Sequence, residues 1–309
     1  MIKYIAKRLL MLIPILLVVT FVIFTLLYIT PGDPAKMILG TTATDEAVAQ
    51  LRTELGLDQP FLIQYLNYMK DLIFHFDIGT SYSTRQPVIQ EIMNCLPATL
   101  KLAFSSILIA VVVGIPIGVI SAVKQYSIFD NIVMVLGLVG ISMPVFWLGL
   151  LLILFFSVQM GWLPASGYSS WQQMIMPAVT LSAQSIAVVA RMTRSSMLEE
   201  IRKDYIRTVR MKGQTEMRIT IFHGLRNALI PIVTVIGTQF GSLLGGAVMC
   251  ETIFSIPGIG RLMVDSIKAR DFPVVQGGVL FIAIGFALVN LIVDIIYAFL
   301  DPKIKAQYK

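Results

Sequence analysis

The chain has 309 residues, of which 56% are hydrophobic and only 14% are charged, and its mean hydropathy is +0.80. Soluble domains carry about 25% charged residues, so this composition excludes a soluble enzyme, a disordered chain and a disulfide scaffold. The formal net charge of +6 fits basic residues on the cytoplasmic side of a membrane, so we expect lipid and no nucleic acid as a partner. Cys95 and Cys250 have neither disulfide nor zinc-ligand spacing, and we expect no metal site.

Long uncharged stretches predict six membrane-spanning helices, because about 20 apolar residues are needed to cross a bilayer. The first is an N-terminal helix over 1–30, whose apolar run is too long for a signal peptide, so we expect it to be retained. The other five form a core over 99–300, with spans at about 101–123, 131–157, 173–190, 228–250 and 273–299. The predicted fold class is therefore an all-α integral membrane protein.

The lysines and arginines predict the orientation of these spans. Most of them lie in segments that are cytoplasmic if the N-terminus is inside, including the tail 301–309. Both termini are therefore predicted to be cytoplasmic. The region 31–98 is then extracytoplasmic, and apolar residues at helical spacing in 45–55 and 61–74 predict short helices there.

The long loop 191–226 is predicted to lie on the cytoplasmic side. Its apolar residues have helical spacing on both sides of Gly213, which predicts two short helices joined at a bend. Spacing alone leaves two interpretations open, a solvated connector or a docking element for a cytoplasmic partner. The chain contains no G-x-x-x-x-G-K-[ST] motif, so we expect no enzyme activity and no catalytic residue here, and ATP would have to act through another subunit.

Short motifs in a fixed order resemble those of the permease subunits of ABC importers. The resemblance covers nearly the whole chain and is to the branch that carries dipeptides, oligopeptides, glutathione and nickel, specifically to the first of its two permease subunits. The motifs are PGDP (31–34), ELGLDQP (54–60), LPATL (96–100), SMPVFW (142–147), DYIRTVRMKG (204–213), HGLRNA (223–228), ETIFSIPGIGR (251–261), RDFPVVQ (270–276), NLIVD (290–294) and DPKI (301–304).

This resemblance implies a type I importer permease with six transmembrane helices in the inner plasma membrane of a bacterium. It implies four kinds of partner: a homologous second permease, two ATP-binding subunits, an extracytoplasmic solute-binding protein and membrane lipid. ATP and magnesium would be bound by the partner subunits, and this chain would bind no cofactor. Short peptides are the favoured substrates, with glutathione, nickel or a nickel chelate as alternatives. A proton-coupled secondary transporter is the alternative from another class.

The resemblance also implies that the loop 191–226 couples the chain to the ATP-binding subunits. The importer pattern there is Glu-Ala-Ala, three residues, Gly, nine residues, Ile, one residue, Leu-Pro; Gly213 and Leu225 match it, whereas Arg207, His223 and Arg226 depart from it. A contact assigned to the family's glutamate therefore does not transfer to Arg207. The predicted coupling residues are Tyr205, Arg207, Thr208, Arg210, Lys212, Gly213, Thr215, His223, Arg226 and Asn227.

Two further sets of residues are candidates for the path through the membrane. Gly237, Gly241 and Gly245 repeat at a four-residue spacing, which predicts close helix packing within the chain, a pore wall or a subunit seam. Asp294 is an acid inside a span, so we expect it to pair with a basic or polar group near the inner end or, alternatively, to join a proton relay. Asn290 lies four residues earlier on the same face.

Glu251 and Arg261 flank a segment rich in proline and glycine on the predicted outer side. One interpretation is a polar re-entrant turn. The other is an outer gate or a dock for the solute-binding protein.

Overall fold

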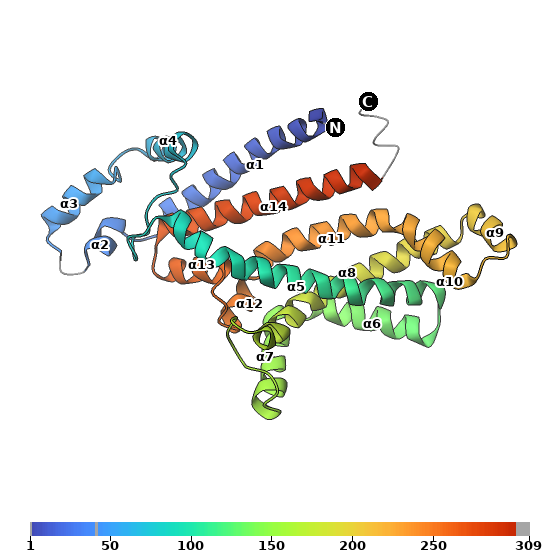
Figure 1. The fold of residues 1–309 in the computed structure, drawn as a ribbon. Helices are drawn as coiled ribbons and strands as arrows, with labels where there is room; N and C mark the ends of the chain where they lie inside the picture. The colour runs from blue at the N-terminus through green and yellow to red at the C-terminus, as the bar shows by residue number, and fades with distance from the viewer. Residues whose placement is uncertain (1, 41–42, 301–309) are drawn as a thin grey trace. The chain divides into compact units, whose positions relative to one another are not determined.

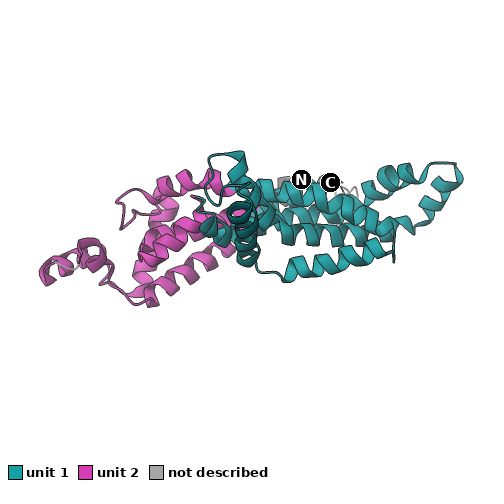
Figure 2. Ribbon diagram, turned by 90° about the horizontal axis from the view of Figure 1, so that it is seen from below, with its two compact units in different colours: residues 1–8, 100–256, 286–309 teal, residues 9–99, 257–285 magenta. Residues whose placement is uncertain are grey.

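The computed structural model describes residues 2–40 and 43–300, so the predicted cytoplasmic tail 301–309 lies outside the described residues. Within these ranges every regular element is helical, apart from a single antiparallel bridge between Thr80 and Pro87. The helices fall into two compact units (Figure 2). Of the described residues, unit 1 contains 2–8, 100–256 and 286–300, and unit 2 contains 9–40, 43–99 and 257–285. The predicted all-α class is confirmed.

Five helices of the described chain are long and apolar enough to cross a bilayer (Figure 1). These candidate spans are 8–29 in α1 (Ile2–Ile29), α5 (Val88–Val123), α8 (Trp171–Ile201), 216–245 ending in α11 (Arg226–Gly246), and 272–296 in α14 (Phe272–Leu300). Two helices extend past the limits predicted from the sequence. α5 begins at Val88, well before 101, and α8 continues to Ile201, well past 190.

The span predicted over 131–157 is a bent pair of helices and not one straight helix. α6 (Ile128–Ser142) and the helical segment Val145–Gln159, which begins with α7 (Val145–Leu152), meet at an angle of 103°. The break falls at Met143 and Pro144, both of which have extended backbone. Proline disfavours helical geometry in the residue before it, and this signal lay inside the uncharged run from which a single span was predicted.

The core of unit 1 is built around α8, which packs against α5, α6, α7 and α11. Glycines on α5 permit the closest approach: a Cβ atom at Gly118 would lie 2.5 Å from the carbonyl oxygen of Ala190 and 2.6 Å from the Cβ atom of Thr193. Near the end of α8, the buried side chain of Met197 packs with Ala122 of α5 and with Ala228 and Ile232 of α11. The helix begins at a capping box in which Ser170 and Gln173 exchange hydrogen bonds.

Unit 2 contains the short helices of the region 31–98 together with the segment 257–285. The helices are α2 (Pro34–Leu39), α3 (Asp45–Glu54), α4 (Phe61–Lys70) and α13 (Ile259–Lys268). Asp33 caps α2 by accepting from the amide of Ala35, with proline in the first helical turn, and Thr44 caps α3. The apolar spacing in 45–55 and 61–74 therefore predicted α3 and α4, whereas α13 was not predicted.

Two apolar clusters hold unit 2 together. Rings of α1 and α4 pack edge to face, among them Phe21 against Tyr65 with centroids 5.3 Å apart and Tyr28 against Phe61 at 5.0 Å. A separate core consists of the buried side chains Val88, Ile92, Ile259 and Val274.

Candidate functional site

The predicted coupling loop forms an elbow between α8 and α11. α9 (Asp204–Met211) leads to a turn in which Gly213 has φ +78°, and α10 (Glu216–Arg218) then continues through the π-helical segment Ile219–Leu225 directly into α11. A positive φ is accessible to glycine without steric cost, so the bend lies where the sequence predicts it. The residues 191–201, predicted as loop, belong to α8 because charge marks the edge of the membrane and not the end of a helix.

The tip of the elbow presents charged and apolar side chains to its surroundings. Met211 and Met217 are 88% and 74% exposed, and Arg207, Thr208, Lys212 and Thr215 are exposed as well. Arg210 forms a bidentate ion pair with Glu216 across the bend, in which Nε donates to Oε1 (2.5 Å) and Nη2 donates to Oε2 (3.0 Å). Exposed methionines on a short amphipathic helix are typical of a docking surface.

Tyr205 links the elbow to both spanning helices. Its hydroxyl donates to Oε2 of Glu200 on α8 (2.8 Å) and accepts from Nδ2 of Asn227 on α11 (2.9 Å), and Asn227 also donates to the carbonyl oxygen of His223 (3.2 Å). Burial is the main cause that raises the pKa of Tyr205 above its ordinary value, so the hydroxyl remains protonated as a donor. The neighbouring Ile206 is completely buried. α9 is thus anchored to the end of α8 and the start of α11 at once.

The three predicted glycines of α11 divide into two kinds. Gly237 and Gly241 face α14: a Cβ atom at Gly237 would overlap Val293, and one at Gly241 would lie 3.0 Å from the Phe286 ring. These two glycines therefore serve packing within the chain. Gly245 is exposed and is the one of the three whose surface is free for a pore or seam.

The helices α8 and α11 run antiparallel. Met197 near the end of α8 packs with Ile232 near the start of α11, and Gln239 donates to the Ser185 hydroxyl at 3.2 Å farther along. Each helix turns by about 100° per residue, so in an antiparallel pair the residues that precede two facing residues project from the same side. Gln184 and Thr238 precede Ser185 and Gln239, and both are exposed.

A row of exposed polar side chains follows this side of both helices. We call it the polar track; it comprises Gln184, Arg191 and Ser195 of α8 and Thr234, Thr238 and Ser242 of α11. The sequence analysis missed it, although the four-residue repeat of Thr234, Thr238 and Ser242 was the available signal. Polar side chains on membrane helices ordinarily face a bundle interior or a water-filled cavity and not lipid.

Asp294 pairs with Arg8, whose Nη1 lies 3.1 Å from Oδ2. A basic partner near the inner end is what the sequence predicted for this acid. Asn290 donates to the carbonyl oxygen of Phe286 (3.0 Å), one turn earlier in α14.

The two predicted outer residues lie in different units and differ in exposure. Glu251 of α12 (Val248–Ile253), in unit 1, is completely buried, so it has no surface for a docking partner. The interpretations as a polar re-entrant turn or an outer gate remain. Arg261 of α13, in unit 2, pairs with Asp265 at 3.6 Å on the exposed side of its helix.

No group of three or more His, Cys, Asp or Glu side chains within residues 2–40 and 43–300 is arranged to hold a metal ion. Asp130, a buried carboxylate that the sequence analysis missed, is held by Arg194, at 2.6 Å between Oδ1 and Nε, and by the Ser121 hydroxyl. It therefore acts in packing.

Comparisons with known proteins agree with this architecture. The chain is 44% identical to the dipeptide transport system permease protein DppB of Alkalihalophilus pseudofirmus, over 99% of this chain and 100% of that protein. It is 46% identical to the glutathione transport system permease protein GsiC of Salmonella choleraesuis and 44% identical to that of Escherichia coli K12, over 99% of both chains in each case.

Among solved structures, the inward-facing MetNI methionine ABC transporter has the same fold, with a TM-score of 0.57 at 22% identity over 69% of this chain and 97% of that chain. Two family models match, for the binding-protein-dependent transport system inner membrane component over residues 114–306 and for its N-terminal part over residues 1–103. The chain therefore belongs to the family of inner membrane components of binding-protein-dependent transport systems.

Proposed function

We propose that this chain forms one half of the translocation path of an ATP-driven importer of short peptides. The observation that carries the proposal is the polar track, because it runs along the two helices that the elbow joins. The relatives' names support the substrate class: one is a dipeptide permease and others are glutathione permeases, and glutathione is itself a tripeptide.

The proposed energy source is a pair of ATP-binding subunits docked on the elbow. The chain has no phosphate-binding loop of its own, so ATP and magnesium are assigned to these partners and this chain carries no catalytic residue. A docked subunit would press on α9, and Tyr205 would pass the displacement to Glu200 of α8 and Asn227 of α11. Both helices of the polar track would then shift together between inward-open and outward-open states.

Two further partners complete the proposed complex. A homologous second permease covers the polar track, so that the path lies between the two chains. An extracytoplasmic solute-binding protein delivers the peptide to unit 2, where Arg261 is exposed enough to contact it.

The test is uptake of a radiolabelled dipeptide by the complete transporter in proteoliposomes. Thr238→Trp on the polar track is expected to lower ATP-driven uptake by more than tenfold while ATP hydrolysis continues. The matched control, Leu136→Trp, places the same ring at an exposed apolar position of α6 and is expected to leave uptake unchanged. Uptake that is unaffected by Thr238→Trp, or that proceeds without ATP on a proton gradient alone, would contradict the proposal.

A further inference from the structure

Unit 2 contains a cavity of 770 Å³, which is the size of a site for a small ligand. Its wall is formed by α1, α4, the ends of α2 and α3, the loops 30–34, 55–59 and 77–85 and the start of α14, all within that unit. The lining combines aromatic rings with amide and charged side chains. The charged side chains that form no ion pair within the unit determine which ligand the cavity could bind.

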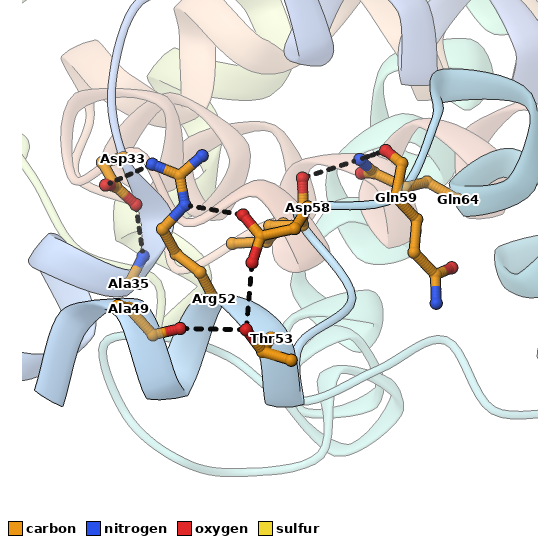
Figure 3. A network of polar contacts seen from close by, with 9 residues as sticks. Asp33, Ala35, Ala49, Arg52, Thr53, Asp58, Gln59 and Gln64 are labelled. Carbon is orange, nitrogen blue, oxygen red and sulfur yellow. Dashed lines mark hydrogen bonds and ion pairs between the residues drawn. The ribbon is translucent and has the colours of Figure 1, made fainter. Parts of the chain in front are cut away.

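One lining cation is already neutralised. Arg52 places Nη1 3.3 Å from Asp33 and Nε 3.2 Å from Asp58 (Figure 3). Gln64, next to Gln59 in Figure 3, donates to the carbonyl oxygen of Gln59 at 2.8 Å. On this side of the cavity the guanidinium of Arg52 is therefore already held by two carboxylates and is not free to pair with a guest.

Two other lining charges have no ionic partner among the described residues. Arg85 donates through Nη2 to the carbonyl oxygen of Ile38 (3.1 Å) and forms no ion pair within residues 2–40 and 43–300. Its backbone is held at φ +61°, a conformation that costs free energy in a residue other than glycine and that concentrates at functional sites. Asp77 accepts from the amide of Gly79 (2.8 Å), and no Lys, Arg or His side chain of the described chain pairs with it.

A buried hydroxyl in the same lining also lacks a partner. The Tyr68 hydroxyl is inaccessible to solvent and makes no hydrogen bond with any described residue. Its ring stacks on Phe24 with centroids 5.8 Å apart, which fixes its direction. Burial raises the pKa of Tyr68 to about 12, so the hydroxyl is a permanent donor at neutral pH. A buried donor without an acceptor is costly, so the hydroxyl would gain an acceptor if a guest displaced the side chains that cover it and supplied an oxygen.

We propose that this cavity binds a short peptide with free termini on the extracytoplasmic side. Arg85 takes the terminal carboxylate and Asp77 takes the terminal ammonium. Tyr68, once the guest has displaced the side chains that cover its hydroxyl, donates to a peptide carbonyl. An unpaired cation, an unpaired anion and an orphan donor in one cavity match the two ends and the middle of such a zwitterion. The inference rests on the proposed function, because it gives peptides delivered to the outer face a holding site on the permease itself.

The experiment measures peptide binding by the complete transporter in nanodiscs without its solute-binding protein. The probes are alanyl-phenylalanine, its C-terminal amide and its N-acetyl derivative, measured by equilibrium dialysis. The wild type is expected to bind the free dipeptide about tenfold more tightly than either capped form, as expected for one charge-assisted hydrogen bond. This comparison of ligands requires no variant to fold.

Three variants then assign the residue that binds each part of the peptide. Arg85→Gln is expected to abolish the preference for the free dipeptide over its amide, and Asp77→Asn is expected to abolish the preference over the acetylated form. Tyr68→Phe is expected to lower the affinity for all three probes severalfold. The matched controls are Lys70→Gln and Tyr65→Phe on the same helix α4; neither residue lines the cavity, and both controls are expected to bind as the wild type does.

The site is overturned if the wild type binds none of the probes, if it binds all three equally, or if Arg85→Gln behaves as Lys70→Gln does. Retention of these probes only after the solute-binding protein is added would also overturn it, since the site would then belong to that protein. ATP-driven uptake by the same preparation separates the two claims. Normal uptake without binding of the probes would contradict the proposed cavity site and leave the proposed function intact. Absence of peptide uptake would contradict the proposed function.

Discussion

Arg194 of α8 and Asp130 of α6 form a bidentate ion pair, in which Nε lies 2.6 Å from Oδ1 and Nη2 lies 2.7 Å from Oδ2. The carboxylate side chain is only 2% exposed. It also accepts from the Ser121 hydroxyl of α5 and from the amide of Tyr126 (2.9 Å). One carboxylate thus joins α5, α6 and α8, three of the helices that form unit 1.

Removal of one partner from this pair is expected to destabilise the protein strongly. Arg194→Met leaves a buried carboxylate without its cation, and such a loss typically costs about 3–5 kcal/mol. Thermal unfolding of the detergent-purified protein measures the effect. The double variant Asp130→Leu with Arg194→Met is expected to recover much of the stability, because neither charge is then buried alone. Lys124→Gln, at an exposed position nearby, is the control. Equal melting temperatures for Arg194→Met and Lys124→Gln would show that the ion pair contributes nothing to stability.

Substitution of Gly237, a buried glycine of α11, is expected to force α11 and α14 apart. A Cβ atom at Gly237 would overlap Val293, and overpacking of this kind typically costs about 1–3 kcal/mol. Gly237→Ala should therefore lower the melting temperature, whereas Gly245→Ala at an exposed position should not. Combining Gly237→Ala with Val293→Ala, which makes the facing side chain smaller, should restore the melting temperature. Failure of the rescue would show that the close approach is not the cause.

The bend of the elbow is expected to tolerate asparagine and not valine. Gly213 has φ +78°, and a Cβ atom added to it would meet no other atom within 4 Å, so backbone strain alone decides the outcome. Valine in this region costs about 1–2 kcal/mol, whereas asparagine occurs there more readily. We expect Gly213→Val to lower uptake per ATP hydrolysed and Gly213→Asn to retain it. Equal coupling ratios in the two variants would remove the bend from the coupling path, and charge reversal of Lys212 tests its exposed surface in the same assay.

Loss of the Tyr205 hydroxyl is expected to uncouple ATP hydrolysis from uptake. Tyr205→Phe keeps the ring but removes the hydrogen bonds to Glu200 and Asn227. The elbow should still bind the ATP-binding subunits, since its tip is unchanged, so ATP hydrolysis should continue while uptake per ATP falls severalfold. Co-purification of the subunits, ATP hydrolysis and uptake are measured on one preparation. A fall in co-purification instead would assign Tyr205 to docking.

Unit 2 is expected to lose stability at alkaline pH through Tyr82. Burial, together with the nearby Asp271, raises the pKa of Tyr82 to about 12. The folded state therefore favours the neutral phenol more than the unfolded state does, so stability is constant below about pH 10, the ordinary tyrosine pKa, and falls as pH rises from there towards 12. Ultraviolet titration should show Tyr82 and Tyr68 ionising late, both with a pKa of about 12, and Tyr82→Phe should reduce that late step from two tyrosines to one. A titration of Tyr82 at about pH 10 would contradict the assignment.

Asp271 is expected to hold the loop 80–87 in place. Its carboxylate accepts from the Ser81 hydroxyl (2.5 Å) and from the amides of Tyr82 and Ser83 (3.0 Å each), and it is 2% exposed. Asp271→Ala leaves the buried Ser81 hydroxyl without its acceptor, which costs about 1–3 kcal/mol, and it releases the amides of Tyr82 and Ser83. Hydrogen exchange at the Ser83 amide should therefore accelerate. Unchanged exchange there would show that the carboxylate does not restrain the loop.

The sequence predicted the spanning helices well because bilayer thickness fixes their length and excludes charge. It also located the bend at Gly213, since few other residues adopt that backbone. It failed at Pro144, where a break inside an uncharged run left no change of charge to mark it. The pairing of Asp130 with Arg194 joins residues far apart in the chain, so spacing could not reveal it. The glycine repeat showed a shared face but not that α14 occupies it.

The corner at Pro144 constrains the surrounding lipid. The 15 residues of α6 extend for about 22 Å at ~1.5 Å per residue, which is less than the ~30 Å hydrocarbon thickness of a typical bilayer. Where the backbone turns by 103°, carbonyl groups freed from the helix need water or protein as partners. The hydrocarbon layer beside this corner must therefore be locally thinner than average, or another polypeptide must shield it. A chain with such a corner therefore selects the lipids and proteins around it by the thickness of the hydrocarbon layer as well as by charge.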